Sequence, residues 1–366
     1  MPNAVTHVDL RDFRNYERLS LDLDPRTTIF VGPNGVGKTN VVEAVQLLLT
    51  AESFRKPAWE DVVRWRAGES VLSASVEGDT GRTDITARIT ERRSPSFSVN
   101  NKRLRRTRDV ADVLPCVVFT PDDLQMVKGS AENRRSAIDG IGDRLSKTYR
   151  SLRQDYERTV RQRNRALKES AADSVLDVLT ERAAETGARL VAHRLKLFER
   201  MRRASIASYG VISDGQPLGV EYVSEWLPNG DEGSETTASD AARALREALE
   251  ERAAEERGRG MTLAGPHRDD LVFLVEDRDS RVFGSQGQQR SIALAWKLAE
   301  VDVVDAVAGK APALLLDDVM SELDRGRRRA LATFVGTRTQ TLATTTNLDY
   351  FEQETLEQAT VVRLER

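Results

Sequence analysis

The segment Thr28-Ile-Phe-Val-Gly-Pro-Asn-Gly-Val-Gly-Lys-Thr39 restricts what this chain can fold into more than any other stretch. Its second part has the GxxxxGK[ST] spacing of a phosphate-binding loop. Residues 28–31 form a short apolar, β-rich run, and residues 41–49 have the length and apolar content of a buried helix. The glycines therefore fall at a strand-to-helix turn, which is the context that the motif requires. The sequence predicts an α/β core with a nucleotide site at this turn.

Different groups of the loop are expected to contact the phosphates and the magnesium ion. Glycines let the backbone adopt conformations closed to other residues, so that successive N–H groups face an anion. Lys38 would reach the β- and γ-phosphates, and the Thr39 hydroxyl would ligate magnesium. The alternative is a glycine-rich turn without a ligand. The predicted nucleotide contacts in this loop are Gly32, Pro33, Asn34, Gly35, Val36, Gly37, Lys38 and Thr39.

Composition excludes several classes of protein. The 366 residues carry 55 basic and 58 acidic side chains, a net charge of −3, so any nucleic-acid surface must be local. There is no apolar run of membrane-spanning length and no signal-like N-terminus, so we expect a soluble cytoplasmic protein. The single cysteine, Cys116, lies in an apolar run and is expected in a strand core. Three histidines and one cysteine leave no cluster with zinc spacing.

Two strands, residues 5–10 and 19–23, are expected before the loop, with residues 11–16 as their connection. Because this connection precedes the strand that leads into the phosphate loop, Arg14, Asn15 or Tyr16 could contact the nucleotide base. Ordinary packing explains Tyr16 equally well. Beyond the loop helix, strands are expected at residues 71–77, 83–90 and 97–99, with Asn100-Asn101 as a hairpin turn.

The run that follows this turn contains five cations in seven residues: Lys102, Arg103, Arg105, Arg106 and Arg108. A solvated hairpin edge explains such a run in most proteins. Contact with a nucleic-acid backbone is a competing explanation, because these side chains could neutralise several phosphates.

The middle of the chain has helical composition, and the end returns to α/β patterning. Helices are expected at residues 145–168, 175–208 and 241–257, and residues 228–239 are expected to form a mobile loop. A hairpin of residues 271–275 and 281–283 comes next, then a helix at 292–307, a strand at 313–316, a helix at 325–334 and strands at 339–343 and 361–364. The simplest architecture is a head formed by residues 1–125 and 258–366, interrupted by a mainly helical inserted domain, residues 126–257.

A second motif, Leu314-Leu-Leu-Asp-Asp318, is a hydrophobic strand that ends in two carboxylates, the form of a Walker B element. Asp317 would hold magnesium opposite Thr39, and Asp318 would polarise the attacking water. Alternatively, the paired aspartates only cap the next helix.

A third motif, Ser285-Gln-Gly-Gln-Gln-Arg290, opens a predicted helix with a serine and a glycine. Such a helix start forms an anion site. Since Lys38 already serves the chain's own triphosphate, Ser285, Gly287 and Gln288 make most sense as contacts to the nucleotide of a partner subunit. Residues 321–324 would lie across the same interface. An ordinary N-cap also explains Ser285 alone.

These motifs, in this order around a large insertion, resemble the head of the ABC ATPase superfamily, in the branch that includes the SMC proteins. The RecF family is the closer resemblance, and it covers nearly the whole chain. The most specific matching segments are Gly265-Pro-His-Arg-Asp-Asp-Leu271 and Gly287-Gln-Gln-Arg290; Phe13-Arg-Asn-Tyr16 and Ser53-Phe-Arg55 also match. The resemblance implies an α/β fold with a P-loop ABC-type ATPase head.

Some residues depart from the general ABC pattern. The signature begins Ser-Gln-Gly rather than Ser-Gly-Gly, Asp318 replaces the usual glutamate, and Thr344-Thr-Thr346 stands where ABC heads place a switch histidine. Gln125 is a candidate for the Q-loop glutamine. These departures suggest slow hydrolysis, because water positioning dominates this chemistry. His267 is expected to be structural rather than catalytic.

By resemblance, the chain is expected to bind ATP and Mg²⁺, to dimerise in the ATP-bound state and to act as a weak, DNA-stimulated ATPase. It would bind duplex and gapped DNA in recombinational repair and replication restart. RecO and RecR, and indirectly the recombinase RecA, are the implied partners. The alternative is a regulatory interaction module that binds ATP, barely hydrolyses it and has no direct DNA specificity.

Overall fold

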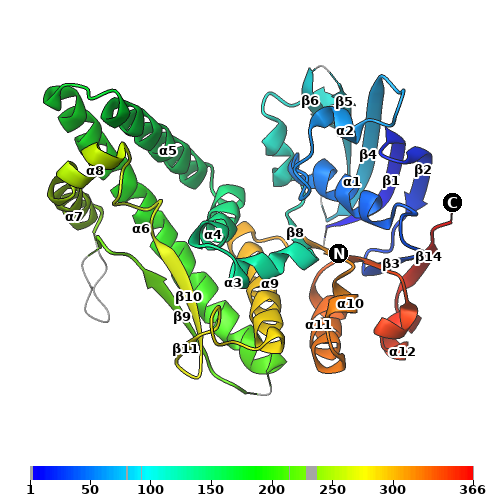
Figure 1. Ribbon diagram of the computed structural model, residues 1–366. Coiled ribbons are helices and arrows are strands. Elements are labelled where there is room, and N and C mark those ends of the chain that lie inside the picture. Colours follow the sequence, from blue (N-terminus) through cyan, green and yellow to red (C-terminus); the bar gives the residue numbers. More distant parts are fainter. Residues whose placement is uncertain (1–2, 80, 92, 214, 228–236, 366) are drawn as a thin grey trace. The chain divides into compact units, whose positions relative to one another are not determined.

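The computed structural model describes residues 3–79, 81–91, 93–213, 215–227 and 237–365. The chain divides into two compact units. The head unit comprises Met1–Asp123 and Lys297–Arg366, and the inserted unit comprises Leu124–Trp296. Figure 1 labels the elements of both units, which are described separately below.

A five-stranded parallel sheet forms one layer of the head unit, in the order β14-β3-β13-β12-β8. Its strands are β3 (Thr27–Val31), β8 (Cys116–Phe119), β12 (Ala313–Asp317), β13 (Thr341–Thr345) and β14 (Thr360–Arg363). All residues of β3, β12 and β13 are buried, as expected for central parallel strands. Cys116 is buried in β8, as predicted. The carboxyl ends of parallel strands share one edge, so the ends of β3, β12 and β13 lie close together.

A six-stranded antiparallel sheet, in the order β2-β1-β4-β5-β6-β7, forms a second layer. Its strands are β1 (Ala4–Phe13), β2 (Tyr16–Asp22), β4 (Glu69–Gly78), β5 (Gly81–Thr90), β6 (Arg93–Val99) and β7 (Lys102–Arg103). Helix α1 (Lys38–Thr50) contacts strands of both sheets (Figure 1). Because α1 is rich in valine and leucine around its whole circumference, it is buried between the two layers.

Shorter elements complete the head unit. They are α2 (Trp59–Val62), η1 (Thr107–Asp112), η2 (Pro121–Leu124), α10 (Val319–Glu322), α11 (Arg325–Arg338), η3 (Leu348–Tyr350) and α12 (Gln353–Glu357). Helix α9 (Gln286–Ala308) starts in the inserted unit and ends in the head unit.

The inserted unit is built around α6 (Asp173–Ile212), on which α5 (Lys147–Lys168) and α7 (Ala238–Glu251) pack. Its other helices are α3 (Gln125–Lys128), α4 (Ala131–Leu145) and α8 (Ala253–Arg259). A three-stranded sheet, β11-β10-β9, also belongs to it, with β9 (Leu218–Val223), β10 (Asp270–Val275) and β11 (Arg278–Asp279).

Several expectations differ from the structure. The connection between the first two strands is only Arg14-Asn15, because β1 and β2 extend into the segment 11–16. The predicted helix 241–257 is two helices, α7 and α8, separated at Arg252. The predicted loop 228–239 lies largely outside the described residues, and only 237–239 are described, at the start of α7.

The predicted hairpin after residue 270 exists, but its second strand is wrong. Glu276 and Asp277 adopt left-handed backbone angles and make a tight turn, so β11 is Arg278–Asp279 and residues 281–283 lie beyond it. On its other side β10 pairs with β9, which the sequence did not predict. This pairing explains why residues 258–296 group with the inserted helices in the structure rather than with the head.

Candidate functional site

The phosphate loop spans the gap between the end of β3 at Val31 and the start of α1 at Lys38, as predicted. Gly35 and Gly37 have φ angles of 79° and 113°, a region that favours glycine. A Cβ atom on Gly37 would lie 2.6 Å from the Tyr16 hydroxyl, and one on Gly32 would lie 2.5 Å from the Leu364 carbonyl oxygen. Larger residues at these positions would therefore distort the loop.

Lys38 is folded back into its own loop. Its Nζ donates hydrogen bonds to the carbonyl oxygens of Gly32 and Pro33, at 2.8 and 3.0 Å. Burial lowers the pKa of the Lys38 ammonium, and the negative charges of Asp318 and Asp317 oppose that shift. The two aspartates are thus near enough to act on Lys38 electrostatically, which brings the first and second sequence motifs into one site.

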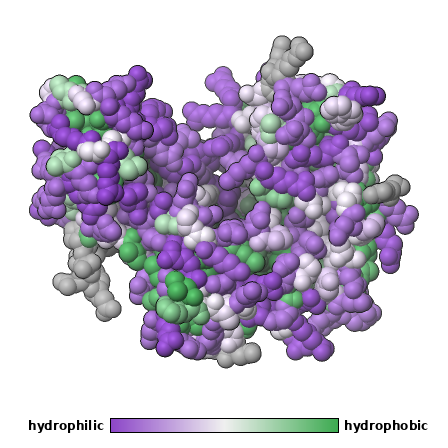
Figure 2. Space-filling view, in the orientation of Figure 1, coloured by the Kyte–Doolittle hydropathy of each residue, from purple (hydrophilic) through white to green (hydrophobic). Residues whose placement is uncertain are grey.

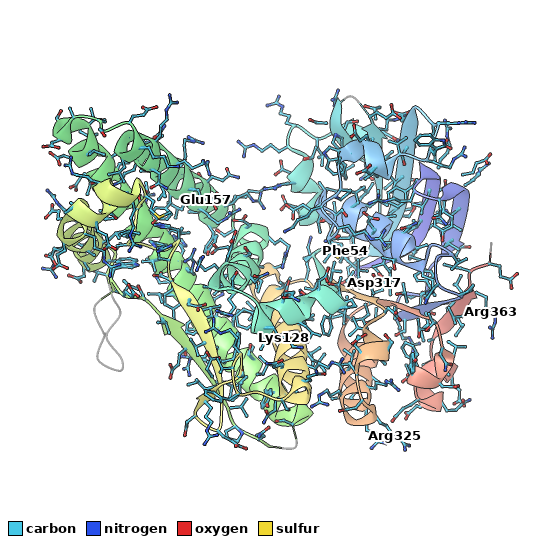
Figure 3. The ribbon with its side chains drawn as sticks, in the orientation of Figure 1. Phe54, Lys128, Glu157, Asp317, Arg325 and Arg363 are labelled. Carbon is cyan, nitrogen blue, oxygen red and sulfur yellow. The ribbon has the colours of Figure 1, made fainter. Side chains whose placement is uncertain are left out.

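The second motif is held by a residue from the neighbouring strand. Asp317 ends β12 and is buried, and its Oδ1 accepts a hydrogen bond from Thr344 Oγ1 on β13 at 2.9 Å. The same Thr344 oxygen accepts a bond from the Asp318 backbone N–H, also at 2.9 Å. Thr344 therefore orients both aspartates. Asp317 is labelled in Figure 3.

Asp318 occupies the N-cap position of α10 with a φ of 51°, but its side chain makes no capping hydrogen bond. Its Oδ1 is buried without a hydrogen-bond partner among the described residues. Burial, reinforced by Asp317, raises the pKa of the Asp318 carboxyl. A buried carboxylate oxygen with no partner is costly unless a ligand or water completes it. This observation disfavours the helix-cap explanation of the motif.

A divalent cation fits these residues. The described part of the chain holds no group of three or more His, Cys, Asp or Glu that could bind a metal alone. Asp317, the unpartnered Oδ1 of Asp318 and the half-buried Thr39 hydroxyl are hard oxygen ligands, and Mg²⁺ takes its remaining ligands from phosphate and water. The donor set suits an ion that arrives together with a phosphate ligand.

The β1–β2 hairpin supports the phosphate loop directly. Asn15 Nδ2 donates to the Val36 carbonyl oxygen at 3.0 Å, and Asn15 Oδ1 accepts from Asn40 Nδ2 at 2.7 Å. The Tyr16 hydroxyl is buried next to Gly37 without a partner among the described residues, and burial raises its pKa to about 12. Both residues therefore touch the loop backbone. Contact with a nucleotide base stays a prediction.

Glu43 is a buried charged residue that the sequence reasoning missed. It lies on α1, with 1% of its side chain exposed, and accepts hydrogen bonds from Arg14 Nη2 at 2.6 Å and Ser53 Oγ at 2.7 Å. Arg55 Nη1 lies 3.2 Å from its Oε2. A glutamate inside an otherwise apolar helix was the signal available, since a buried carboxylate requires partners.

The third motif lies in the inserted unit at the start of α9. Ser285 Oγ accepts from the Gln288 backbone N–H at 3.1 Å, and Gln288 Oε1 accepts from the Ser285 N–H at 2.9 Å. This is a reciprocal capping box, the ordinary explanation for Ser285. Gln289 is buried and donates to the Ser280 carbonyl oxygen at 2.8 Å. Gly287 lies in the first turn of the helix.

Other candidate residues have local structural partners. In the segment 321–324, Ser321 donates to the Asp318 carbonyl oxygen, and Asp324 caps α11. Gln125, the Q-loop candidate, opens α3. His267 accepts a hydrogen bond from Tyr156 at 2.7 Å and donates to the Thr262 carbonyl oxygen at 3.1 Å, and burial lowers its pKa to about 4.

The basic run lies at the free edge of the antiparallel sheet. Lys102 and Arg103 form β7, and all five cations of the run are exposed. Arg108 pairs with Glu52 at 3.0 Å. The other four form no ion pair with any residue in the described ranges. By contrast, the arginines of α5 that could serve as another basic surface are ion-paired: Arg153, Arg158, Arg161, Arg163 and Arg165.

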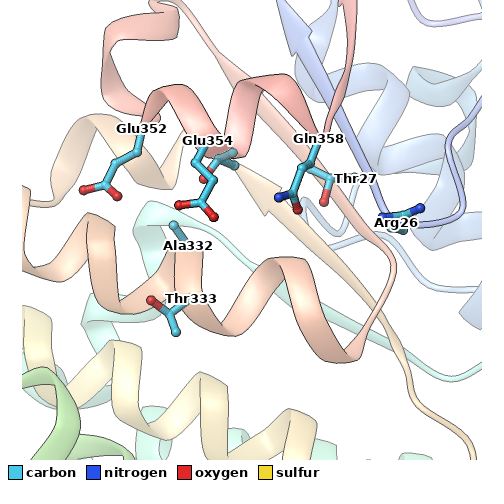
Figure 4. Close-up of a pocket in the computed structure, with 8 residues that line it drawn as sticks. Arg26, Thr27, Ala332, Thr333, Glu352, Glu354 and Gln358 are labelled. Carbon is cyan, nitrogen blue, oxygen red and sulfur yellow. The ribbon is translucent and has the colours of Figure 1, made fainter.

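A separate pocket of about 270 Å³ lies in the head unit, between α11 and α12 (Figure 4). Thr27, at the first position of β3, lines it, so it is at the opposite end of β3 from the phosphate loop. It is therefore separate from the phosphate loop. Its lining residues are Arg26, Thr27, Ala332, Thr333, Glu352, Glu354, Thr355 and Gln358.

Among the residues that the structure describes, no helix has the length and apolar character needed to span a membrane.

Comparison with known proteins identifies relatives along nearly the whole chain. Residues 4–365 match the RecF/RecN/SMC N terminal domain. The DNA replication and repair protein RecF of Heliobacterium modesticaldum is 37% identical over 368 residues, covering 99% of this chain and 97% of the relative. The protein of the same name from Halalkalibacterium halodurans is 34% identical over 366 residues, covering 99% and 98%.

Solved structures give the same result. A structure of the recombination mediator protein RecF with ATP, in the RecFOR pathway, matches with a TM-score of 0.86 at 26% identity, covering 96% of this chain and 94% of the other. An Smc head bound to the C-winged helix domain of ScpA matches with a TM-score of 0.58 at 16% identity, covering 99% and 94%. The second match shows a shared fold alone.

Proposed function

Because this chain belongs to the RecF family of DNA replication and repair proteins, within the SMC-type ABC ATPases, we propose that it is an ATP-gated, dimerising DNA-binding protein. It would act in recombinational repair and replication restart at gapped DNA, where single and double strands meet. The observation that carries the proposal is that the charges of Asp317 and Asp318, at the end of β12, act on Lys38 of the glycine-rich loop.

ATP is the proposed ligand of the loop from Gly32 to Thr39, in keeping with the ATP that the related RecF structure contains. Lys38 would exchange its two carbonyl partners for the β- and γ-phosphates. Thr39 and Asp317 would hold Mg²⁺, which neutralises phosphate charge when bound. Asn15, through its hydrogen bond to Val36, and Tyr16, through its contact with Gly37, would hold the loop in its phosphate-binding shape.

Hydrolysis would use Asp318 as the group that orients the attacking water. Its unpartnered Oδ1 is available to accept a proton from a water molecule, and its raised pKa favours accepting one. An aspartate is one methylene shorter than the glutamate of other ABC heads. The Thr344 hydroxyl, which stands where those heads have a histidine, is already hydrogen-bonded to Asp317 and to the Asp318 N–H. Turnover is therefore expected to be slow, with DNA stimulating it by stabilising the closed state.

Closure is proposed to use a second copy of the chain. Ser285, Gly287 and Gln288 would contact the γ-phosphate bound by the partner's loop, through the N-terminal end of α9. The Gln288 side chain, which reaches back to Ser285 in the single chain, would then be free to turn toward the phosphate. ATP would thus act as a latch between two copies, and hydrolysis would open it.

The proposed DNA surface is the exposed run at β7. Four of its cations have no ion-pair partner in the described ranges, whereas each of the α5 arginines considered above lies within 4.0 Å of a carboxylate. Its spacing suits phosphate contacts, which position a protein without reading sequence. By analogy with the RecFOR pathway named for the related structure, RecO and RecR are the proposed protein partners. The proposed outcome of their action together is the loading of RecA at gaps in DNA.

Sedimentation velocity with and without Mg-ATP tests the latch. Lys38→Met should abolish nucleotide binding, whereas Ser285→Arg should bind nucleotide normally and stay monomeric. Equal dimer formation by Ser285→Arg and the unmodified protein would refute the role of the third motif.

Salt titrations of duplex DNA binding test the basic surface. Replacing Lys102, Arg103, Arg105 and Arg106 with alanine should weaken binding and reduce the slope of log K against log salt by about 0.9 for each phosphate that the variant no longer neutralises. The matched control replaces Arg158, Arg161 and Arg165, which are exposed but ion-paired on α5. An unchanged slope in the first variant would move the DNA surface elsewhere.

A regulatory module that binds ATP without acting on DNA is the second candidate. The replaced signature glycine and the aspartate at position 318 favour it, because both predict slow turnover. ATP turnover measured with and without gapped DNA separates the two functions. Stimulation by DNA supports the switch, and a low rate that DNA leaves unchanged supports the module.

A further inference from the structure

Two neighbouring apolar side chains, Val282 and Phe283, are exposed immediately before the third motif. Their exposed fractions are 62% and 67%. Single exposed apolar residues are common, but an adjacent pair of this size is a feature of contact surfaces. Most of the face shown in Figure 2 is hydrophilic, with small hydrophobic areas.

The turn that carries this pair is well ordered by its own hydrogen bonds. The N–H groups of Val282 and Phe283 both donate to the Asp279 carbonyl oxygen, at 3.1 and 2.9 Å, and the Gly284 N–H donates to that of Ser280 at 3.1 Å. A Cβ atom on Gly284 would lie 2.4 Å from the Ser280 oxygen. Buried Gln289, which belongs to the third motif, donates to the same oxygen. A turn fixed in this way loses little conformational entropy when it binds a partner.

We propose that Val282 and Phe283 form an apolar contact with a second copy of this chain in the ATP-bound dimer. This inference rests on the proposed function, and it adds the contact that surrounds the proposed γ-phosphate site. Phe283 and Ser285 are two residues apart, so their Cα atoms are separated by at most about 7.6 Å. A surface that brings a phosphate to Ser285 therefore also covers Phe283.

The charges of the turn favour a protein partner over nucleic acid. Residues 276–281 carry three carboxylates, Glu276, Asp277 and Asp279, against two guanidinium groups, Arg278 and Arg281, and Arg281 Nε lies 3.8 Å from the Asp279 carboxylate. A phosphate backbone would therefore meet an apolar pair beside a turn in which carboxylates outnumber cations. An apolar surround would instead exclude water from the γ-phosphate and strengthen the hydrogen bonds at Ser285.

Sedimentation velocity with Mg-ATP on the Phe283→Ser and Val282→Ser variants tests the proposal. A symmetric dimer contains each contact twice, and truncating a buried aromatic anchor commonly costs a factor of ten or more in affinity. The dimer dissociation constant of Phe283→Ser should therefore rise by roughly tenfold to a hundredfold. The ATP affinity of the monomer and the melting temperature without nucleotide should stay unchanged. The matched control is Val211→Ser, which alters a more exposed valine on α6 and should leave dimerisation unchanged.

The outcomes separate this inference from the function on which it rests. A wild-type dimer that needs ATP, together with a monomeric Phe283→Ser variant, supports the contact. Equal dimerisation of Phe283→Ser and wild type overturns it while leaving the latch intact, even if the variant loses binding to another protein. A wild-type chain that stays monomeric with ATP overturns the latch itself.

A second measurement avoids truncating the phenylalanine. Val282→Cys can be labelled with an environment-sensitive fluorophore, because the chain's other cysteine, Cys116, is buried. ATP should shift the emission of the label to the blue in the unmodified background but leave it unchanged when Ser285→Arg is also present. Emission that ATP does not change in the unmodified background contradicts the contact.

Discussion

Replacing Thr344 by valine should weaken Mg²⁺-dependent nucleotide binding, because its hydroxyl holds both aspartates of the second motif. Thr344 is 1% exposed, so water cannot take the place of the hydroxyl. Valine preserves the shape of the side chain but removes the donor to Asp317 and the acceptor for the Asp318 N–H.

The size of the effect follows from these two bonds. A hydrogen bond to a carboxylate contributes about 1.5–3 kcal/mol, and a buried N–H left without an acceptor costs about 1–3 kcal/mol. We expect Thr344→Val to lower the free energy of unfolding by about 2.5–6 kcal/mol. Residues that orient metal ligands typically change metal affinity or activity by about 10- to 100-fold, so the Mg²⁺ concentration needed for half-maximal ATP binding should rise by that factor.

Urea unfolding and Mg²⁺ titrations with a fluorescent ATP analogue measure the two effects. Thr344→Ser keeps the hydroxyl and should restore Mg²⁺ affinity. Thr345→Val is the matched control, since Thr345 is also buried and its hydroxyl bonds to Asn347 rather than to an aspartate. This variant should lose stability but not Mg²⁺ affinity. Equal Mg²⁺ midpoints for Thr344→Val and Thr345→Val would refute the role assigned to Thr344.

Three further predictions concern the support of the site and of the inserted unit. Glu43→Gln should lower the free energy of unfolding, measured in urea, by about 3 kcal/mol, because the nearly buried Arg14 loses its carboxylate partner. Glu69→Gln, the control, removes the charge of the exposed pair with Arg88 and should change the free energy of unfolding by less than about 1 kcal/mol. Asn15→Ala should weaken ATP and GTP binding by the same factor, roughly fivefold or more for its two hydrogen bonds, because it supports the loop; a selective loss of ATP would instead mean that Asn15 contacts the base. Burial lowers the pKa of His267 to about 4, so the unfolded chain takes up this proton more readily, and the stability that the neutral imidazole contributes is complete above about pH 6.5 and is lost as the pH falls toward 4. The free energy of unfolding of His267→Gln, measured in urea, should therefore fall less between pH 6.5 and 4 than that of the unmodified protein, by as much as about 3 kcal/mol. Parallel pH curves for the two proteins would contradict this.

Local patterns in the sequence were enough to predict the elements that carry the first two motifs. The phosphate loop was predictable because Gly35 and Gly37 occupy angles that few other residues adopt, and because apolar runs flank them. The turn at Asn100-Asn101 was predictable for a similar reason, since both asparagines have positive φ angles of 48° and 63°. These features depend on neighbours in the chain, so a sequence alone contains them.

Features that depend on distant partners were not predictable in the same way. Residues 218–223 form strand β9 by pairing with β10, which begins 47 residues after β9 ends. The buried carboxylate of Glu43 is paired with Arg14, which precedes it in the sequence, and with Arg55, which follows it. Val282 and Phe283 resemble a strand in composition, but they lie exposed on a turn, so the strand predicted there was wrong.

The antiparallel sheet has a consequence for how ATP could control DNA binding. The hairpin that supports the phosphate loop joins β1 to β2, and the basic run begins in β7, at the other edge of the same hydrogen-bonded sheet. A continuous sheet of six strands resists deformation, so nucleotide binding has little means of reshaping β7 within one chain. Pairing two copies would instead place two basic edges in one particle, where the second binds DNA at a high effective concentration. Regulation would then come from valency rather than from a change in the affinity of either edge.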